Sequence, residues 1–253
     1  MTSVTGRIKQ IKQPRGGYIK PKDLTVTQFT DKNSLNKNEN IHSSLIGLAT
    51  DYLTRYLLGE NLYSVFNTSI RGAIIISEID LANELLNQMR PSLDDICIVN
   101  AVKLSAFDVC YRSGIFGYKP VNLINPDKDT IENIRILVNR CITFFNEYGP
   151  ITKTGFTFEG GYTNEITTGD ADYLTKNYLI DLKVSVKPPT KNHTLQVLIY
   201  YLMGMHSLNS KDFLNVENIA LFNPRLNTLY SIKINDIDKD IINTVKTSVI
   251  GYK

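Results

Sequence analysis

The chain has 253 residues, a formal net charge of +3, 42% apolar residues and 21% charged residues. These values are ordinary for a water-soluble globular protein with one large domain or two small ones, and the charge is too small to indicate nucleic-acid binding by itself. No run of about eighteen apolar residues occurs and the N-terminus lacks the apolar centre of a signal peptide, so we expect a cytoplasmic protein with no membrane span. The three cysteines, Cys97, Cys110 and Cys141, are scattered and odd in number, which predicts buried thiols and no disulfide framework.

Residues 1–40 are predicted to form a basic, flexible leader and a polar loop. Residues 1–22 contain six basic side chains and no acidic one. Such a segment is typical either of a solvated leader or of a basic arm that contacts phosphates. Residues 23–30 have the pattern of a short strand.

Residues 41–150 are predicted to be mainly helical. An apolar face recurs through 41–58, with His42 at its start and Gly59 at its end. Residues 61–76 predict a short helix running into a buried apolar segment, and helices are expected over 78–89 and 93–111. Asp129 or Thr130 can cap a long helix over 131–148, which Gly149-Pro150 ends. This half shows no chemistry of its own and could be a scaffold or a partner-binding surface.

After residue 150 the pattern changes to strands, predicted over 153–159 and in a hairpin at 170–174 and 178–184. Lys176-Asn177 suits the tight turn of that hairpin. With a two-residue turn, Asp172 lies opposite Asp181 and both side chains share one face. Lys183 joins this face, and Asp170 has the same parity.

Two carboxylates that face each other repel unless a positive charge lies between them. Hard cations such as Mg²⁺ take carboxylate oxygens, and a neighbouring lysine suits a site that handles phosphate and an attacking water. The chemistry of the hairpin therefore predicts a divalent-metal site. Glu159 and Glu165 are the nearby carboxylates that could complete its shell.

A helix is predicted from about residue 191 to 204, after Pro188-Pro189. Gln196 and Tyr200 are four residues apart, so they share one helix face, and His193 lies on that face too. Lys187 and Lys191 flank the proline turn and are candidates to hold phosphate, as is Arg225 at the tip of a hairpin formed by 218–223 and 229–234. A helix over 237–249 is expected to close the chain.

The ordered set Gly169-x-x-Asp172, Asp181-x-Lys183 and Gln196-x-x-x-Tyr200 resembles the PD-(D/E)XK nuclease superfamily, in its RecB-like branch. The resemblance implies an α/β fold: a helical N-terminal half, packed as one integrated domain on a restriction-endonuclease-like core over 151–253. In that core a mixed β-sheet is flanked by helices. It also implies a Mg²⁺- or Mn²⁺-dependent nuclease that hydrolyses phosphodiester bonds of DNA, as an exo- or endonuclease in recombination, repair or mobile-element defence. Separately, the richness in lysine, asparagine and isoleucine is typical of an AT-rich bacterial, phage or mobile-element genome.

The resemblance also implies roles for individual residues. Asp172, Asp181 and the carbonyl of Leu182 would hold the metal, with Glu159 and His42 as further candidate ligands. Lys183 would position the attacking water, and Gln196 and Tyr200 would orient Lys183 and the phosphate. His193, Lys187, Lys191 and Arg225 would contact nucleic acid.

Three cysteines are too few for the four-cysteine iron–sulfur cluster of some members, and no phosphate-binding loop is present, so a helicase partner would be another protein. Two alternatives remain. The fold could be a binding module for nucleic acid or a protein, with a weak or unused site, or the motif could be a coincidence in an unrelated α/β protein.

Overall fold

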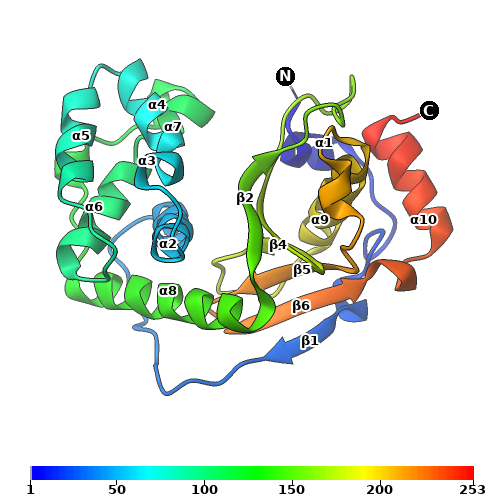
Figure 1. Ribbon diagram of the computed structural model, residues 1–253, viewed down its shortest axis with the longest axis horizontal. Coiled ribbons are helices and arrows are strands. Elements are labelled where there is room, and N and C mark those ends of the chain that lie inside the picture. The colour runs from blue at the N-terminus through cyan, green and yellow to red at the C-terminus, as the bar shows by residue number, and fades with distance from the viewer. Residues whose placement is uncertain (1) are drawn as a thin grey trace. The chain divides into compact units, whose positions relative to one another are not determined.

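The computed structural model describes residues 2–253 and divides the chain into two compact units (Figure 1). Unit 1 contains the chain up to Thr30 together with Phe144–Lys253, and unit 2 contains Asp31–Thr143. The division differs from the predicted boundaries at residues 40 and 150, because the N-terminal segment folds with the C-terminal part of the chain.

Unit 2 is built from helices. They are α2 (Ser43–Leu57), α3 (Leu62–Val65), α4 (Asn67–Ile75), α5 (Ile79–Asn87), α6 (Asp95–Ser105), α7 (Asp108–Arg112), the short 3-10 turns Ile115–Gly117 and Val121–Leu123, and most of α8 (Lys128–Tyr148). The three cysteines are buried and free, as predicted.

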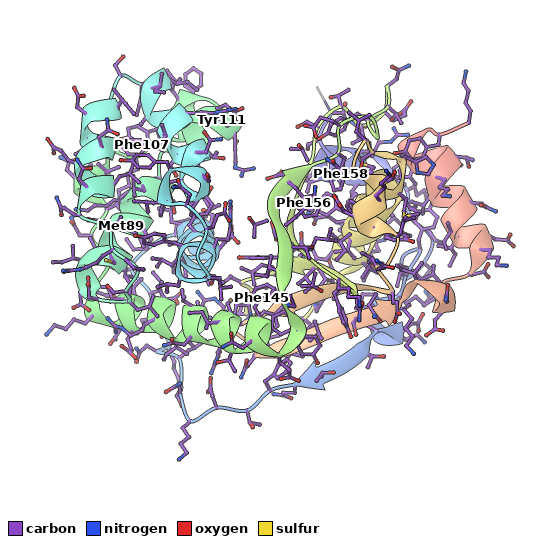
Figure 2. The ribbon with its side chains drawn as sticks, in the orientation of Figure 1. Met89, Phe107, Tyr111, Phe145, Phe156 and Phe158 are labelled. Atoms are coloured by element: carbon purple, nitrogen blue, oxygen red, sulfur yellow. The ribbon has the colours of Figure 1, made fainter. Side chains whose placement is uncertain are left out.

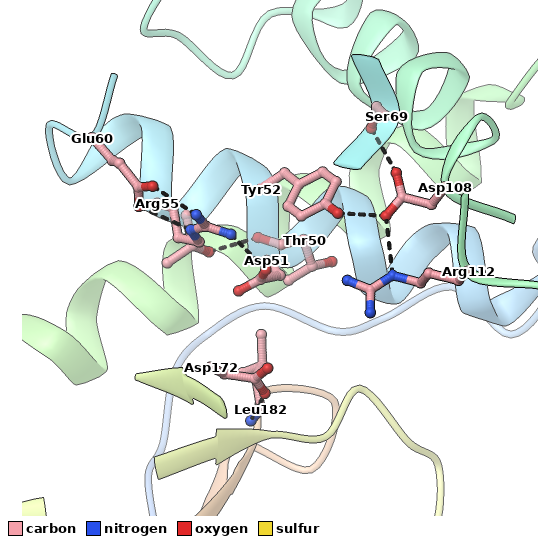
Figure 3. A network of polar contacts seen from close by, with 11 residues as sticks. Thr50, Asp51, Tyr52, Arg55, Glu60, Ser69, Asp108, Arg112, Asp172 and Leu182 are labelled. Carbon is pink, nitrogen blue, oxygen red and sulfur yellow. Dashed lines mark hydrogen bonds and ion pairs between the residues drawn. The ribbon is translucent and has the colours of Figure 1, made fainter. Parts of the chain in front are cut away.

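Two predictions for unit 2 are corrected by the structure. Residues 61–76 do not enter a buried apolar segment: α3 and α4 fill them, and Ile74 and Ile75 are 57% and 52% exposed. The predicted helix over 93–111 is divided between α6 and α7, and the break lets the buried carboxylate of Asp108 start α7. There Asp108 accepts hydrogen bonds from Tyr52 Oη (2.5 Å) and Ser69 Oγ (2.6 Å), as Figure 3 shows.

Unit 1 contains a six-stranded mixed sheet in the order β1-β6-β5-β4-β3-β2. The strands are β1 (Thr25–Gln28), β2 (Ile151–Thr157), β3 (Asp170–Thr175), β4 (Tyr178–Leu182), β5 (Asn218–Asn223) and β6 (Thr228–Lys233). The helices are α1 (Val4–Gln10), α9 (Lys191–His206) and α10 (Lys239–Thr244), with 3-10 turns at Pro21–Asp23, Ser210–Phe213 and Ile234–Asp236 and a π-helical turn at Val245–Ile250. Strands β2, β3 and β4 form an antiparallel meander, and β5 is parallel to β4.

Helices cover both faces of the sheet. Leu179 and Leu221 belong to a core that includes Leu198 of α9 and Ile8 of α1. On the other face the end of α8 packs through Phe144, whose ring stacks on Phe222 at 4.0 Å, and through Phe145, 4.5 Å from Tyr173 (Figure 2 labels Phe145). The α/β class with a mixed sheet and flanking helices is thus confirmed.

The N-terminal segment differs from the predicted leader. Ser3 caps α1 by accepting a hydrogen bond from the Gly6 N–H, and Val4 and Ile8 are buried one helical turn apart. Further on, β1 adds to the sheet beside β6. Apolar burial therefore fixes this segment on unit 1. Within residues 2–253, no helix combines the length and apolarity that crossing a membrane requires.

Candidate active site

The hairpin β3–β4 has the predicted register. Tyr173 pairs with Ile180 and Leu174 with Leu179, which places Asp172 opposite Asp181 one step further along the ladder. Lys176-Asn177 forms the turn, and the Tyr178 N–H donates to Thr175 Oγ1 (3.2 Å). Both carboxylates lie on the sheet face of Leu174 and Leu179, because side chains alternate along a strand. That face carries α9.

Asp181 and Lys183 form an ion pair at the C-terminal end of β4. Lys183 Nζ lies 2.6 Å from Asp181 Oδ2, and the two side chains are 24% and 3% exposed. That oxygen is buried, so the ion pair is shielded from water. Asp181 is consequently a buried acid whose Oδ2 is held by the ammonium of Lys183.

Asp172 is fixed by the backbone of the neighbouring strand. Its Oδ2 accepts a hydrogen bond of 2.7 Å from the Leu182 N–H, which Figure 3 shows in close view. The bond links the start of β3 to the end of β4. It therefore locks the position of the first acid to the strand that carries the second acid and the lysine.

The pKa of Lys183 depends on two opposing effects, its burial and the negative charges of the nearby aspartates. Burial lowers this pKa, but the negative charges of Asp181, Asp172 and Asp170 outweigh burial and raise it above its ordinary value. Lys183 is thus protonated throughout the neutral range. With three carboxylates and one ammonium, the site has a formal net charge of −2. One of the carboxylates, Asp170, is exposed.

Gln196 and Tyr200 meet on one face of α9. Gln196 Nε2 donates to Tyr200 Oη (2.8 Å), both side chains are buried, and Phe158, labelled in Figure 2, stacks on the Tyr200 ring at 5.4 Å. Burial first, then the charges of Asp181 and Asp172, raise the pKa of Tyr200 well above its ordinary value. Tyr200 is a neutral phenol in the electrostatic field of the two acids.

His193 is held by the first turn of α9. A capping box joins it to Thr190, whose N–H donates to His193 Nδ1 (3.2 Å). Burial and the charge of Lys183 lower the pKa of His193, against an opposing effect of Asp181. The imidazole is therefore neutral near pH 7, with its proton on Nε2.

The basic candidates Lys187 and Arg225 are linked by a residue that the sequence interpretation did not single out. Asn223 Nδ2 donates to the carbonyl of Ser185 (2.7 Å), and Asn223 Oδ1 accepts from the Arg225 N–H (3.0 Å). Asn223 ends β5, which runs parallel to β4, so both loops leave the sheet at one edge. The sequence feature that could have identified Asn223 is an asparagine at the end of a buried strand, directly before a proline. Lys191 starts α9 and is exposed.

Three further candidates for metal ligands, Glu159, Glu165 and His42, make other polar contacts in the structure. Glu159 is exposed beyond β2 and accepts from Thr157 Oγ1 (2.6 Å). Glu165 pairs with Arg7 at 2.7 Å. His42 belongs to unit 2, where its Nδ1 caps α2 by accepting from the Ser44 N–H (3.3 Å).

The donor set of the hairpin fits a divalent cation with few protein ligands. Among residues 2–253 no group of three or more histidine, cysteine, aspartate or glutamate side chains is arranged to hold a metal. Mg²⁺, however, usually takes one or two protein carboxylates and completes its shell with water and substrate phosphate. Asp172 and Asp181 are such a pair, and a cation at Asp181 Oδ2 would share that buried oxygen with Lys183 Nζ, which lies 2.6 Å from it.

Comparison with protein-family models, curated proteins and solved structures finds no match for this chain. Its function is therefore inferred from the site alone.

Proposed function

We propose that this protein is a metal-dependent nuclease of the PD-(D/E)XK type that hydrolyses phosphodiester bonds of DNA. The observation that carries the proposal is the convergence of Asp172, Asp181 and Lys183 where β3 begins and β4 ends, facing the helix that carries Gln196 and Tyr200. The order of elements also supports it: an antiparallel meander, then a helix, then further strands and a closing helix, as the resemblance implies.

Asp172 and Asp181 would hold Mg²⁺ or Mn²⁺. Such an ion polarises a phosphate and lowers the pKa of a bound water. Lys183, protonated at neutral pH, stabilises negative charge on the reacting phosphate and is itself held in place by Asp181. Tyr200 stays protonated and keeps an O–H to donate, because Gln196 occupies its oxygen as an acceptor. Neutral His193 presents an Nε2–H donor for a phosphate oxygen.

The decisive test compares cleavage of linear and circular DNA, with Mg²⁺ or Mn²⁺, by the wild type, Lys183→Met and Lys211→Met. Lys211 is an exposed lysine beyond the far end of α9, so its substitution is a matched control. We expect the wild type and the control to cleave, and Lys183→Met and EDTA-treated protein to lose at least ~100-fold in rate, since one electrostatic contact to the transition state is worth about that factor. Digestion of linear DNA alone would indicate an exonuclease.

A second candidate function, a nucleic-acid-binding module with an unused site, is favoured by one observation: Lys183 Nζ already lies 2.6 Å from the buried Oδ2 of Asp181. If all three proteins bind DNA equally and none cleaves it with either metal, this candidate replaces the nuclease.

A further inference from the structure

The N-terminal basic segment, residues 9–22, carries positive charge that the candidate site does not use. Its basic side chains are all exposed, and none has an ion-pair partner within residues 2–253; they are Lys9, Lys12, Arg15, Lys20 and Lys22. Arg7, just before the segment, is different because it pairs with Glu165 at 2.7 Å. Exposed lysines and arginines that fold without a partner remain available to an external anion.

The segment is fixed to the first turn of α9 by two hydrogen bonds and one close backbone approach. Gln13 is buried and its Nε2 donates to Asn192 Oδ1 (2.7 Å), and Thr194 Oγ1 donates to the carbonyl of Ile19 (2.7 Å). Between them Gly17 has φ +101°, and a Cβ there would lie 2.6 Å from Lys191 Cβ. The charges are thus carried by a backbone with a defined path on α9.

The same turn of α9 faces the candidate active site. His193 lies between Asn192 and Thr194, and its pKa responds to Lys183 and Asp181. Figure 1 shows α1 beside α9, with the chain then passing on to β1. The basic segment therefore packs on the same turn of α9 that carries His193. Lys191, the first residue of this helix, is exposed there.

The net positive charge of unit 1 is concentrated in residues 1–30. Residues 144–253 contain 11 basic and 11 acidic side chains, whereas residues 1–30 contain 6 basic and 1 acidic. All of the positive excess of unit 1 is therefore N-terminal. The apolar side chains Ile8 and Ile19 are buried, and none of the large apolar side chains in the described residues 2–25 is exposed, which disfavours insertion into a bilayer and favours a soluble polyanion as the partner.

We propose that the N-terminal basic segment binds the phosphate backbone of nucleic acid and holds it beside the candidate active site, with Lys12, Arg15 and Lys20 as the contacts. This proposal rests on the proposed nuclease function for the identity of the polyanion. The contacts are to phosphates, so they add affinity and orientation without selecting a base sequence.

The test measures binding separately from cleavage. Fluorescence anisotropy with a labelled DNA duplex in EDTA, from 50 to 300 mM salt, compares the wild type with Lys12→Gln/Arg15→Gln/Lys20→Gln. The matched control is Lys211→Gln/Lys233→Gln/Lys239→Gln, which removes the same charge from exposed positions of unit 1 outside the segment. We expect the N-terminal variant to bind at least ~10-fold more weakly, and its slope of log K against log salt to fall by up to about 2.7, since each phosphate contact contributes about 0.9. Unchanged thermal melting of both variants verifies folding.

Equal affinity and slope for the two triple variants would overturn the proposal, even if the wild type cleaves DNA. The expected loss of binding would support it, even if no variant cleaves. Vesicles containing phosphatidylserine provide the second arm: binding to them that depends on the three residues, with DNA binding unaffected, would assign the segment to a membrane surface and overturn the proposal.

Discussion

At the scale of single residues, the Asp181–Lys183 pair combines stability with the proposed chemistry. Lys183→Met leaves the buried Asp181 carboxylate without its ion-pair partner. Removing one member of a buried pair is costly, so we expect the free energy of unfolding in urea at pH 7 to fall by about 3–5 kcal/mol. The double variant Asp181→Asn/Lys183→Met, which removes both charges, should recover most of this loss and still not cleave DNA. A double variant no more stable than Lys183→Met would contradict the account.

His193 gives the second prediction at this scale, on pH dependence. Its folded-state pKa is lowered, so between that value and its ordinary pKa of 6.5 the unfolded chain binds more protons than the folded one. Stability must then fall as the pH drops below 6.5, and it is unaffected by His193 above that range. His193→Gln removes this titration and keeps the capping box, because glutamine suits the third helical position.

Urea unfolding at pH 7 and pH 5 measures the effect. The wild type should lose stability relative to His193→Gln between the two pH values. If the difference in stability between the wild type and His193→Gln is the same at pH 7 and pH 5, the environment of His193 does not depress its pKa.

At the scale of elements, Gly17 decides whether the basic segment can lie on α9. Alanine there must adopt φ near +101° and overlap Lys191 Cβ, so we expect Gly17→Ala to destabilise the protein by about 2–4 kcal/mol from backbone strain and overpacking. Gly16→Ala is the control. Its φ is +89°, but its Cβ would meet only the flexible Lys20 side chain at 3.2 Å, so only ~1–2 kcal/mol of strain is expected. If urea unfolding shows the same loss of stability for Gly17→Ala and Gly16→Ala, overlap with Lys191 Cβ does not contribute to the loss.

The elements also show how far a sequence can predict this fold. The β3–β4 hairpin was predictable in register, because alternation and a two-residue turn determine which residues face each other. The hairpin β5–β6 and helix α9 followed from equally local signals. The Gln196–Tyr200 contact was predictable from helical spacing alone.

Other features depended on contacts between distant parts of the chain. Helix α1 has the local signals of Ser3 as cap and Val4 and Ile8 as an apolar pair, but a seven-residue helix is stable only when packed, and its partner α9 lies far along the chain. The boundary between α6 and α7 was missed because the break is stabilised by Tyr52 and Ser69, two residues from other helices. For His42 the sequence allowed two roles, a metal ligand or a helix cap, and the structure shows the cap at the start of α2.

At the scale of the whole molecule, the division into two units predicts that each has its own stability. Unit 2 contains a polar network inside its core: Asp108 accepts from Tyr52 Oη and Ser69 Oγ and lies 3.6 Å from Arg112 Nε. Burial raises the pKa of Asp108 in spite of these partners. Tyr52→Phe removes one hydrogen bond to this acid and keeps the ring, and bonds to charged groups contribute about 1.5–3 kcal/mol.

We therefore expect Tyr52→Phe to lower the stability of unit 2 by about 1.5–3 kcal/mol, because the buried acid loses a donor. Native-state hydrogen exchange resolves the effect by position: protection should fall in α2, α4 and α7, while the amides of β4, β5 and α9 keep their rates. Tyr56→Phe, a matched change on the same helix at a tyrosine away from Asp108, should leave both sets unchanged. Equal loss of protection in the sheet and the helices would show instead that the chain unfolds as one cooperative unit, and the two units would then be divisions of shape without separate stability.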